Sequence, residues 1–308
     1  MAFIENLIAQ RSLFVSLNEA ALRHSTVQTR QRCNGFGNTP QEPDFIAGLT
    51  LDYSQELYRI LMLLFPKTKF SIYSVYCHQK PLADFGASCA PEIGDILFVF
   101  ISNGRKKQLN SLLFQAKITQ SENFWVEPRD LDQLALYAGW PKFKYKRAGS
   151  ITGMVRDILP KTITTGAQYL LIDNHPIYGL SGLPGTFPFG TAIPDNHVVL
   201  SQSLAIDLFD FFQFKNGRPF EAEPAVTNDH WTKMIWDLIG IARDKTTRRI
   251  KAGLIDFPRL TEHLTGLSFT AGDLRGHYSE KYTRNERATN DNEGAISLIL
   301  VESFEAEG

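Results

Sequence analysis

Residues 91–119, PEIGDILFVFISNGRKKQLNSLLFQAKIT, constrain the fold more than any other part of the chain. The run 93–101 is largely apolar, which is typical of a strand that is buried on both faces. Asn103-Gly104 is a strong hairpin-turn signal, and a second strand is expected over 111–119. We therefore expect an antiparallel hairpin in the middle of a core.

Helical and strand patterns alternate around this hairpin. Apolar residues at helical spacing predict helices over 1–30, 44–65 and 128–140. Aromatic and β-branched runs predict strands over 70–78 and 167–173. This order predicts an α/β fold with a central mixed sheet flanked by helices.

The C-terminal part of the chain is expected to be rich in helices. A loop dense in Gly and Pro is expected over 174–198, helices over 203–214 and 229–242, a polar loop over 271–293 and a late strand over 294–303.

Three parts are expected from this pattern. They are an N-terminal helix and loop (1–41), an α/β core (42–175) and a C-terminal region (176–308) whose role the sequence does not indicate.

The bulk composition predicts a globular protein whose net charge creates no strong positive or negative electrostatic field. Of the 308 residues, 43% are hydrophobic and 21% are charged, and the formal net charge is −1. A near-neutral chain needs a local patch or a partner to attract a polyanion. We find no apolar run of about 18 residues and no basic segment ahead of an early apolar run, so we expect no membrane span and a cytoplasmic location.

The cysteines do not indicate a disulfide framework or a zinc site. The chain has an odd number of cysteines, Cys33, Cys77 and Cys89, and none of them forms a CxxC pair, although His78 follows Cys77. We interpret them as isolated small residues in a reducing compartment.

Three polar side chains interrupt the expected hairpin. Because side chains two apart share a face of a strand, Gln115 and Lys117 point the same way, whereas Ala116 faces the opposite side. Asp95 opens the partner strand, and the turn can bring it beside Gln115. Taken singly, Asp95 is also typical of a strand entry and Lys117 of an edge strand, but a lysine inside an apolar strand is rare unless it is paired.

This cluster has the donors of a magnesium or manganese site. Mg²⁺ prefers oxygen ligands, which Asp95, the Gln115 amide and the Ala116 carbonyl can supply. Lys117 can help activate a water or neutralise charge in a transition state.

A further oxygen ligand has to come from the preceding helix. Glu56 is our choice, and Asp52 and Glu42 are the alternatives. A solvated helix carboxylate remains the other interpretation of Glu56.

The sequence resembles the PD-(D/E)xK nuclease superfamily in the order of three features: an acid on a helix, EIGD at the start of a strand, and FQAK on the next strand. In this chain the motif is Asp95…Gln115-Ala116-Lys117. The resemblance covers about residues 42–175. It implies a restriction-endonuclease-like core, Mg²⁺ or Mn²⁺ as cofactor, and hydrolysis of phosphodiester bonds in DNA, with RNA not excluded.

The following helix adds to the resemblance. Gln133 and Tyr137 are four apart and so share a helix face, which is similar to the Gln-x-x-x-Tyr helix of RecB-like members of the superfamily. The resemblance implies a role near the scissile phosphate. The same two residues are also compatible with a simple role in capping the core.

Gln115 departs from the family pattern, which usually has Asp or Glu at this place. A neutral amide binds a divalent cation more weakly than a carboxylate does. Glu92, three residues before Asp95, could supply part of the missing charge.

The densest basic cluster follows that helix. Lys142 and Lys144 alternate with Trp140, Phe143 and Tyr145, a pattern that would let lysines hold phosphates while bases stack on the aromatic rings. A solvated lysine-rich loop is the alternative.

Two functions are therefore expected. The first is a metal-dependent DNA endonuclease, which the resemblance places among effectors of bacterial antiviral defence, with a protein partner or a homo-oligomer presenting the DNA. The second is a degenerate nuclease fold that no longer cuts and acts as a binding or regulatory subunit.

Overall fold

The computed structural model describes residues 3–77, 81–104, 106–173, 187–250 and 295–305. Its helices are α1 (Phe3–Ala9), α2 (Arg11–Gly35), α3 (Glu42–Gly48), α4 (Ser54–Leu64), α5 (Leu131–Gly139), α6 (Leu204–Phe212) and α7 (His230–Ile250). A π-helical turn (Leu49–Tyr53) joins α3 to α4, and 3₁₀ turns cover Pro128–Asp130 and Gly149–Ile151.

The strands are distributed along the whole chain. They are β1 (Thr68–Val75), β2 (Leu82–Asp84), β3 (Ile96–Asn103), β4 (Lys107–Thr119), β5 (Asn123–Trp125), β6 (Phe143–Lys146), β7 (Val155–Arg156), β8 (Ala167–Asp173), β9 (Phe189–Ala192), β10 (His197–Val199), β11 (Gln202–Ser203), β12 (Arg218–Pro219) and β13 (Ser297–Glu305).

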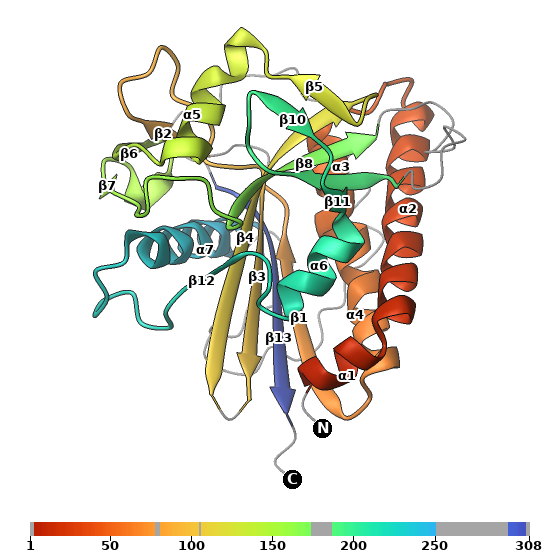
Figure 1. Ribbon diagram of the computed structural model, residues 1–308. Coiled ribbons are helices and arrows are strands. Elements are labelled where there is room, and N and C mark those ends of the chain that lie inside the picture. Colours follow the sequence, from red (N-terminus) through yellow and green to blue (C-terminus); the bar gives the residue numbers. More distant parts are fainter. Residues whose placement is uncertain (1–2, 78–80, 105, 174–186, 251–294, 306–308) are drawn as a thin grey trace.

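One large mixed sheet organises the described part of the chain (Figure 1). Its eight strands run in the order β1-β13-β3-β4-β8-β9-β11, with β12 pairing to β4 beside this path. The β3–β4 pair is the antiparallel hairpin expected around Asn103-Gly104, whereas β13 is parallel to β3 and β8 is parallel to β4. Two small sheets, β10-β5 and β2-β6-β7, lie beside the large one.

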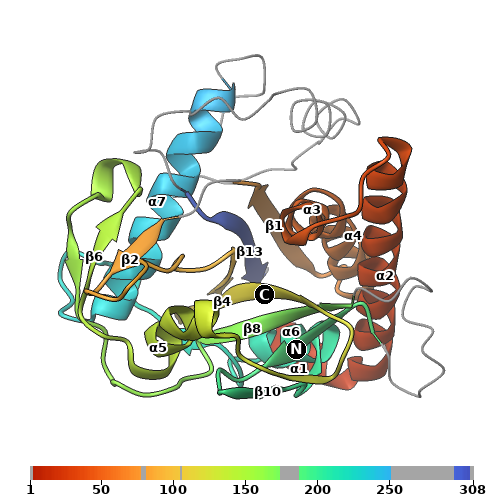
Figure 2. The ribbon, with the colours of Figure 1, turned by 90° about the horizontal axis from the view of Figure 1, so that it is seen from above.

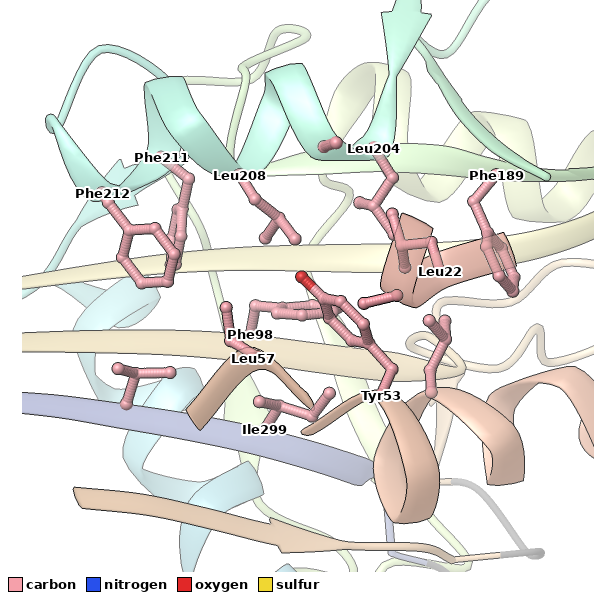
Figure 3. Close-up of a cluster of buried hydrophobic side chains, with 14 of the residues drawn as sticks. Leu22, Tyr53, Leu57, Phe98, Phe189, Leu204, Leu208, Phe211, Phe212 and Ile299 are labelled. Atoms are coloured by element: carbon pink, nitrogen blue, oxygen red, sulfur yellow. The ribbon is translucent and has the colours of Figure 1, made fainter. Parts of the chain in front are cut away.

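Both faces of the large sheet are covered, which explains the apolar run in β3. Phe98 and its same-face neighbours pack into a core with residues of α1 to α4 and α6, and Leu97 and its neighbours pack into a second core with residues of α5 and α7. Figure 2 shows helices on both sides of the strands. Figure 3 shows the first core, where Phe98 lies among Tyr53, Leu208 and Phe212. Leu113, expected on the face of the polar cluster, is therefore buried in the second core.

The α/β class with a mixed sheet flanked by helices is confirmed, although several element bounds differ from expectation. Helix α2 continues to Gly35, beyond the end at residue 30 that was expected for the first helix. Asp95 lies just before β3 rather than inside it. The loop expected over 174–198 contains short strands in its described part, namely β9 and the start of β10. The polar loop expected over 271–293 lies outside the described residues.

The C-terminal region supplies strands as well as helices. It contains α6 and α7, as expected, but β13 also inserts between the edge strand β1 and β3 of the large sheet. Residues from both sides of the expected boundary at 175 therefore share one sheet and its cores. Among the described helices, none combines the length and apolarity needed to cross a bilayer.

Helix α6 buries a carboxylate beneath the sheet. Asp207 is buried on α6, and its Oδ1 accepts a hydrogen bond from Nε2 of Gln202 at 2.5 Å. The other oxygen, Oδ2, is buried without a hydrogen-bond partner among the described residues. Burial raises the pKa of Asp207 to about 6, against an opposing effect of the hydrogen bond from Gln202.

We predict that Asp207→Asn stabilises the protein at neutral pH. Because the pKa of this acid is higher folded than unfolded, the folded state binds more protons, and the wild type should lose stability as pH rises from about 4 to 6. The variant should gain about 1–3 kcal/mol in the free energy of unfolding at pH 7.5 and little at pH 4. Urea unfolding at several pH values measures this, with the exposed Asp195→Asn as control. An equal effect at both pH values would contradict the prediction.

Candidate active site

A stagger between β3 and β4 opens the edge of β4. Strand β3 starts at Ile96, which is paired with Phe114, while β4 continues to Thr119. The last backbone bond of this pair runs from the N–H of Asp95 to the carbonyl of Phe114, at 2.8 Å. Beyond this point the backbone groups of β4 on this side need other partners.

Two carboxylates accept hydrogen bonds from the backbone amides of this open edge. Oδ2 of Asp95 accepts hydrogen bonds from the backbone N–H of Ala116 at 2.6 Å and from Nε2 of Gln115 at 2.5 Å. Oε1 of Glu42, at the start of α3, accepts one from the backbone N–H of Ile118 at 3.1 Å. Because the two amides are two residues apart on one strand, roughly 7 Å along the chain, the two acids flank the Gln-Ala-Lys segment.

The structure thus places Glu42, an alternative in the sequence analysis, beside the motif. Glu56, the preferred helical acid, forms an ion pair with Arg59 one turn further along α4. Asp52 forms a two-point ion pair with Arg32 of α2. Of the three acids considered, Glu42 is the one with a recorded bond to β4.

The candidate lysine is paired with an acid that the sequence analysis did not consider. Nζ of Lys117 donates to Oδ1 of Asp130 at 2.8 Å, and both side chains are largely buried. Asp130 ends the 3₁₀ turn that leads into α5. The ion pair therefore fixes the amine of Lys117 against the start of this helix.

Helix α5 also contacts the segment that carries Asp95. The hydroxyl of Tyr137 donates to the carbonyl of Ile93 at 2.8 Å. Burial raises the pKa of Tyr137 well above that of an ordinary phenol, and the charges of Asp95 and Glu92 add to the shift. Tyr137 is therefore a neutral donor at physiological pH.

The close approach of α5 depends on Gly94. A Cβ added at Gly94 would lie 2.6 Å from Cδ1 of Leu113 and 3.0 Å from the hydroxyl oxygen of Tyr137. Both neighbours are buried. The absence of a side chain at Gly94 is therefore what allows β4, α5 and the Asp95 segment to meet.

Three buried polar atoms of this region lack hydrogen-bond partners among the described residues. They are Oε1 of Gln115 on β4, Nε2 of Gln133 on α5 and the hydroxyl of Tyr169 on β8. Tyr169 is the register partner of Gln115, and its ring lies 6.3 Å from that of Tyr137. Burial raises the pKa of Tyr169, and the carboxylate of Asp130 adds to the shift. Such unsatisfied groups are uncommon in native interiors and are typical of sites that hold a polar ligand or ion.

The donors at this edge suit a hard cation in their chemistry. Asp95 and Glu42 offer carboxylates, and Gln115 offers a buried amide oxygen that has no hydrogen bond of its own. Within the described residues no group of three or more His, Cys, Asp or Glu side chains is arranged to hold a metal ion. A cation here would depend on amide or carbonyl oxygens, such as those of Gln115 and Ala116, beside the carboxylates.

The basic cluster after α5 is only partly arranged as expected. Lys142 and Lys144 are exposed, as phosphate contacts would require. Trp140, Phe143 and Tyr145 are instead buried in the second core. The expectation that bases stack on these rings is therefore wrong, because no base can reach them.

Comparison of this chain with known protein families, with curated proteins and with solved structures finds no match. The relationship to the PD-(D/E)xK superfamily stays a prediction that rests on the motif residues.

The sequence analysis missed Asp130 and Tyr169. Asp130 lies in the first turn of the helix expected over 128–140, where an acid is ordinary, so its position does not reveal Lys117 as partner. Tyr169 lies in the expected strand 167–173, but only the parallel pairing of β4 with β8 brings it beside Gln115.

We predict that Gly94→Ala destabilises the protein because the new methyl group displaces Leu113 or Tyr137. Overpacking of this kind costs about 1–3 kcal/mol. Gly139→Ala, at the end of α5, is the matched control, since a Cβ there meets nothing within 4 Å, and it should be neutral or slightly stabilising. Chemical unfolding of both variants measures the difference, and equal effects would contradict the proposed close packing at Gly94.

Proposed function

We propose that this protein is a metal-dependent phosphodiesterase that cleaves DNA, with RNA as an open alternative, and that its active site is the open edge of β4. The observation that carries the proposal is the position of Asp95 and Glu42. These two carboxylates bind the amides of Ala116 and Ile118, on either side of Lys117. This places acids and a cationic amine around one short strand segment, as the PD-(D/E)xK motif requires.

The chain's own residues have distinct roles in this proposal. Asp95, Glu42, Gln115 and the Ala116 carbonyl would hold Mg²⁺ or Mn²⁺, and Glu42 takes the place of the helical ligand for which Glu56 was first expected. When bound, the ion polarises the scissile phosphate and makes water a better nucleophile at neutral pH. Lys117 stabilises the negative charge that develops on the phosphate oxygens.

The surroundings of Lys117 support positioning of its amine. Asp130 holds the amine in one place, so less conformational entropy is lost when the phosphate binds. Gln133 and Tyr137 lie one turn apart on α5, and in this proposal their buried polar groups orient the substrate and the Asp95 segment. Lys142 and Lys144 are the exposed phosphate contacts. A partner protein or an oligomer that presents DNA, and a role in antiviral defence, remain predictions from the resemblance and the near-neutral charge.

We predict that Lys117→Ala abolishes cleavage while the protein stays folded. Without the amine, the developing charge loses a stabilising partner, and activity should fall by about 10²-fold or more. The measurement is cleavage of supercoiled plasmid, linear DNA and single-stranded RNA with Mg²⁺, Mn²⁺ or EDTA. Lys69→Ala, an exposed lysine on the edge strand β1, is the matched control and should cleave normally.

Metal-dependent cleavage that survives Lys117→Ala would exclude this site. Cleavage that persists in EDTA would exclude a divalent cation as cofactor. Loss of cleavage in both Lys117→Ala and Lys69→Ala would indicate a general effect of charge on DNA binding instead of a role of Lys117 at the open edge.

A second function is favoured by the internal hydrogen bonds of the same residues. Gln115 donates to Asp95, and Lys117 is paired with Asp130. These contacts give Asp95, Lys117 and the amide nitrogen of Gln115 polar partners without a metal or a substrate. A nuclease fold that binds nucleic acid or regulates a complex without cutting would keep such contacts.

We predict that Gln115→Glu separates the two functions. A second buried carboxylate beside Asp95 repels it, so the melting temperature in EDTA should fall by about 2–8 °C. If the edge binds a cation, Mn²⁺ should raise the melting temperature of this variant more than that of the wild type. Differential scanning fluorimetry measures both shifts, with the exposed Gln108→Glu on the same strand as control. No response to Mn²⁺ in either the wild type or Gln115→Glu would favour the degenerate fold.

A further inference from the structure

The small sheet of β5 and β10 carries an exposed aromatic pair. Trp125 is 71% exposed, which is unusual for the largest aromatic side chain. Its ring stacks on that of His197, with centroids 4.7 Å apart and 23° between the planes. The two residues are direct partners in the antiparallel register. The stack therefore holds Trp125 in place but leaves most of its surface in water.

The alternation of side chains along this ribbon explains why Trp125 points outward. Phe124 and Val126 pack inward on a small core that contains Tyr169 and Val198. Because neighbouring residues of a strand face opposite sides, Trp125 faces solvent. Backbone bonds from Val126 to Asn196 and from Leu200 to Glu122 extend the pairing at both ends of the ribbon.

The core beneath the ribbon adjoins the open edge of β4. Its members Tyr169 and Leu171 are the register partners of Gln115 and Lys117, so these four side chains share one face of the sheet. The ribbon therefore covers β8 immediately beside the candidate site. Figure 1 shows β5 and β10 at the same end of the sheet as α5, the helix whose start holds Lys117.

The chemistry of this surface suits a base better than a phosphate. An exposed, fixed aromatic stack offers a flat face on which a nucleobase can add a further layer. Glu122 and Asp195 lie on the segments around the ribbon and would repel a phosphate backbone, whereas the charge of Glu127 is offset by its ion pair with Arg129. The surface therefore suits a base better than a phosphate group.

We propose that Trp125, supported by His197, stacks on an unpaired nucleobase of the nucleic acid bound at the open edge of β4. This inference rests on the proposed function, and it narrows the substrate class to single-stranded or locally unpaired nucleic acid. In an intact duplex both faces of each base are covered by neighbours, so such a surface gains little from it.

Tryptophan fluorescence with the full chain in EDTA tests this contact without cleavage. Trp140 and Trp231 are fully buried, but Trp236 is only partly buried, so the quenching assigned to Trp125 is the part that Trp125→Phe removes. The probes are a single-stranded 20-mer of thymidine, a 20-mer of abasic sugar-phosphate and a 20-base-pair duplex. We expect quenching by the thymidine strand and little by the abasic strand or the duplex.

Substitutions measure the contribution of the ring. Trp125→Ala should weaken binding of the thymidine strand at least about fivefold in an anisotropy titration, because stacking on one aromatic ring contributes that much or more. Trp125→Phe should retain most of the affinity. Val226→Ala, an exposed apolar residue in the loop before α7, is the control and should bind as the wild type does.

The outcomes separate this inference from the proposed function. Metal-dependent cleavage with no quenching and unchanged affinity in Trp125→Ala would overturn the stacking inference alone. Base-dependent quenching that Trp125→Ala removes, in a protein that never cleaves, would support the stacking surface and refute the nuclease. Equal quenching by the abasic strand would overturn the inference, because the contact would then be with the backbone.

Discussion

The stagger between β3 and β4 is the constraint on which the candidate site depends. The backbone amides of a strand inside a sheet donate hydrogen bonds to neighbouring strands. Strand β4, however, extends several residues beyond the start of β3, so two of its amides donate to side chains instead. Asp95 and Glu42 fill those places. The same bonds that complete the sheet thus hold two acids beside Lys117. If the proposed function is correct, structural and chemical roles are combined in one set of contacts, so changes to either acid should affect stability as well as activity.

The site is rigid because neighbouring elements approach it closely. Gly94 admits Tyr137, Tyr137 holds the segment before Asp95, and Asp130 fixes Lys117. Helix α5 is common to these contacts, since it carries Tyr137 and begins immediately after Asp130. Its packing on the second core therefore determines how well the amine and the carboxylates are aligned. This arrangement is compatible with a preorganised active site and also with a structure that no longer reacts, which is why activity and metal binding have to be measured separately.

The sequence predicts the parts of this arrangement that depend on local pattern. The apolar run and Asn103-Gly104 lead correctly to the β3–β4 hairpin, and the period of two places Gln115 and Lys117 on one face. Contacts between distant segments were not predictable in this way. The choice between Glu42 and Glu56 depends on how α3 and α4 lie against the sheet, and the pairing of Lys117 with Asp130 depends on the path of the chain after β4. Alternation alone also could not tell that the rings near Lys142 face the core.

The position of β13 has a consequence for the order of folding. Ser297 pairs with Ile96, and the same strand pairs on its other side with β1, so this side of the sheet joins segments that are very distant in the chain. The β3–β4 hairpin can form from neighbouring residues, whereas β1 and β3 gain their shared partner only after a large loop closes. Until then one edge of the apolar strand β3 is open to pairing with other chains. Folding of this protein should therefore be slow and sensitive to concentration at that late step, even though the segment that carries the candidate chemistry is local.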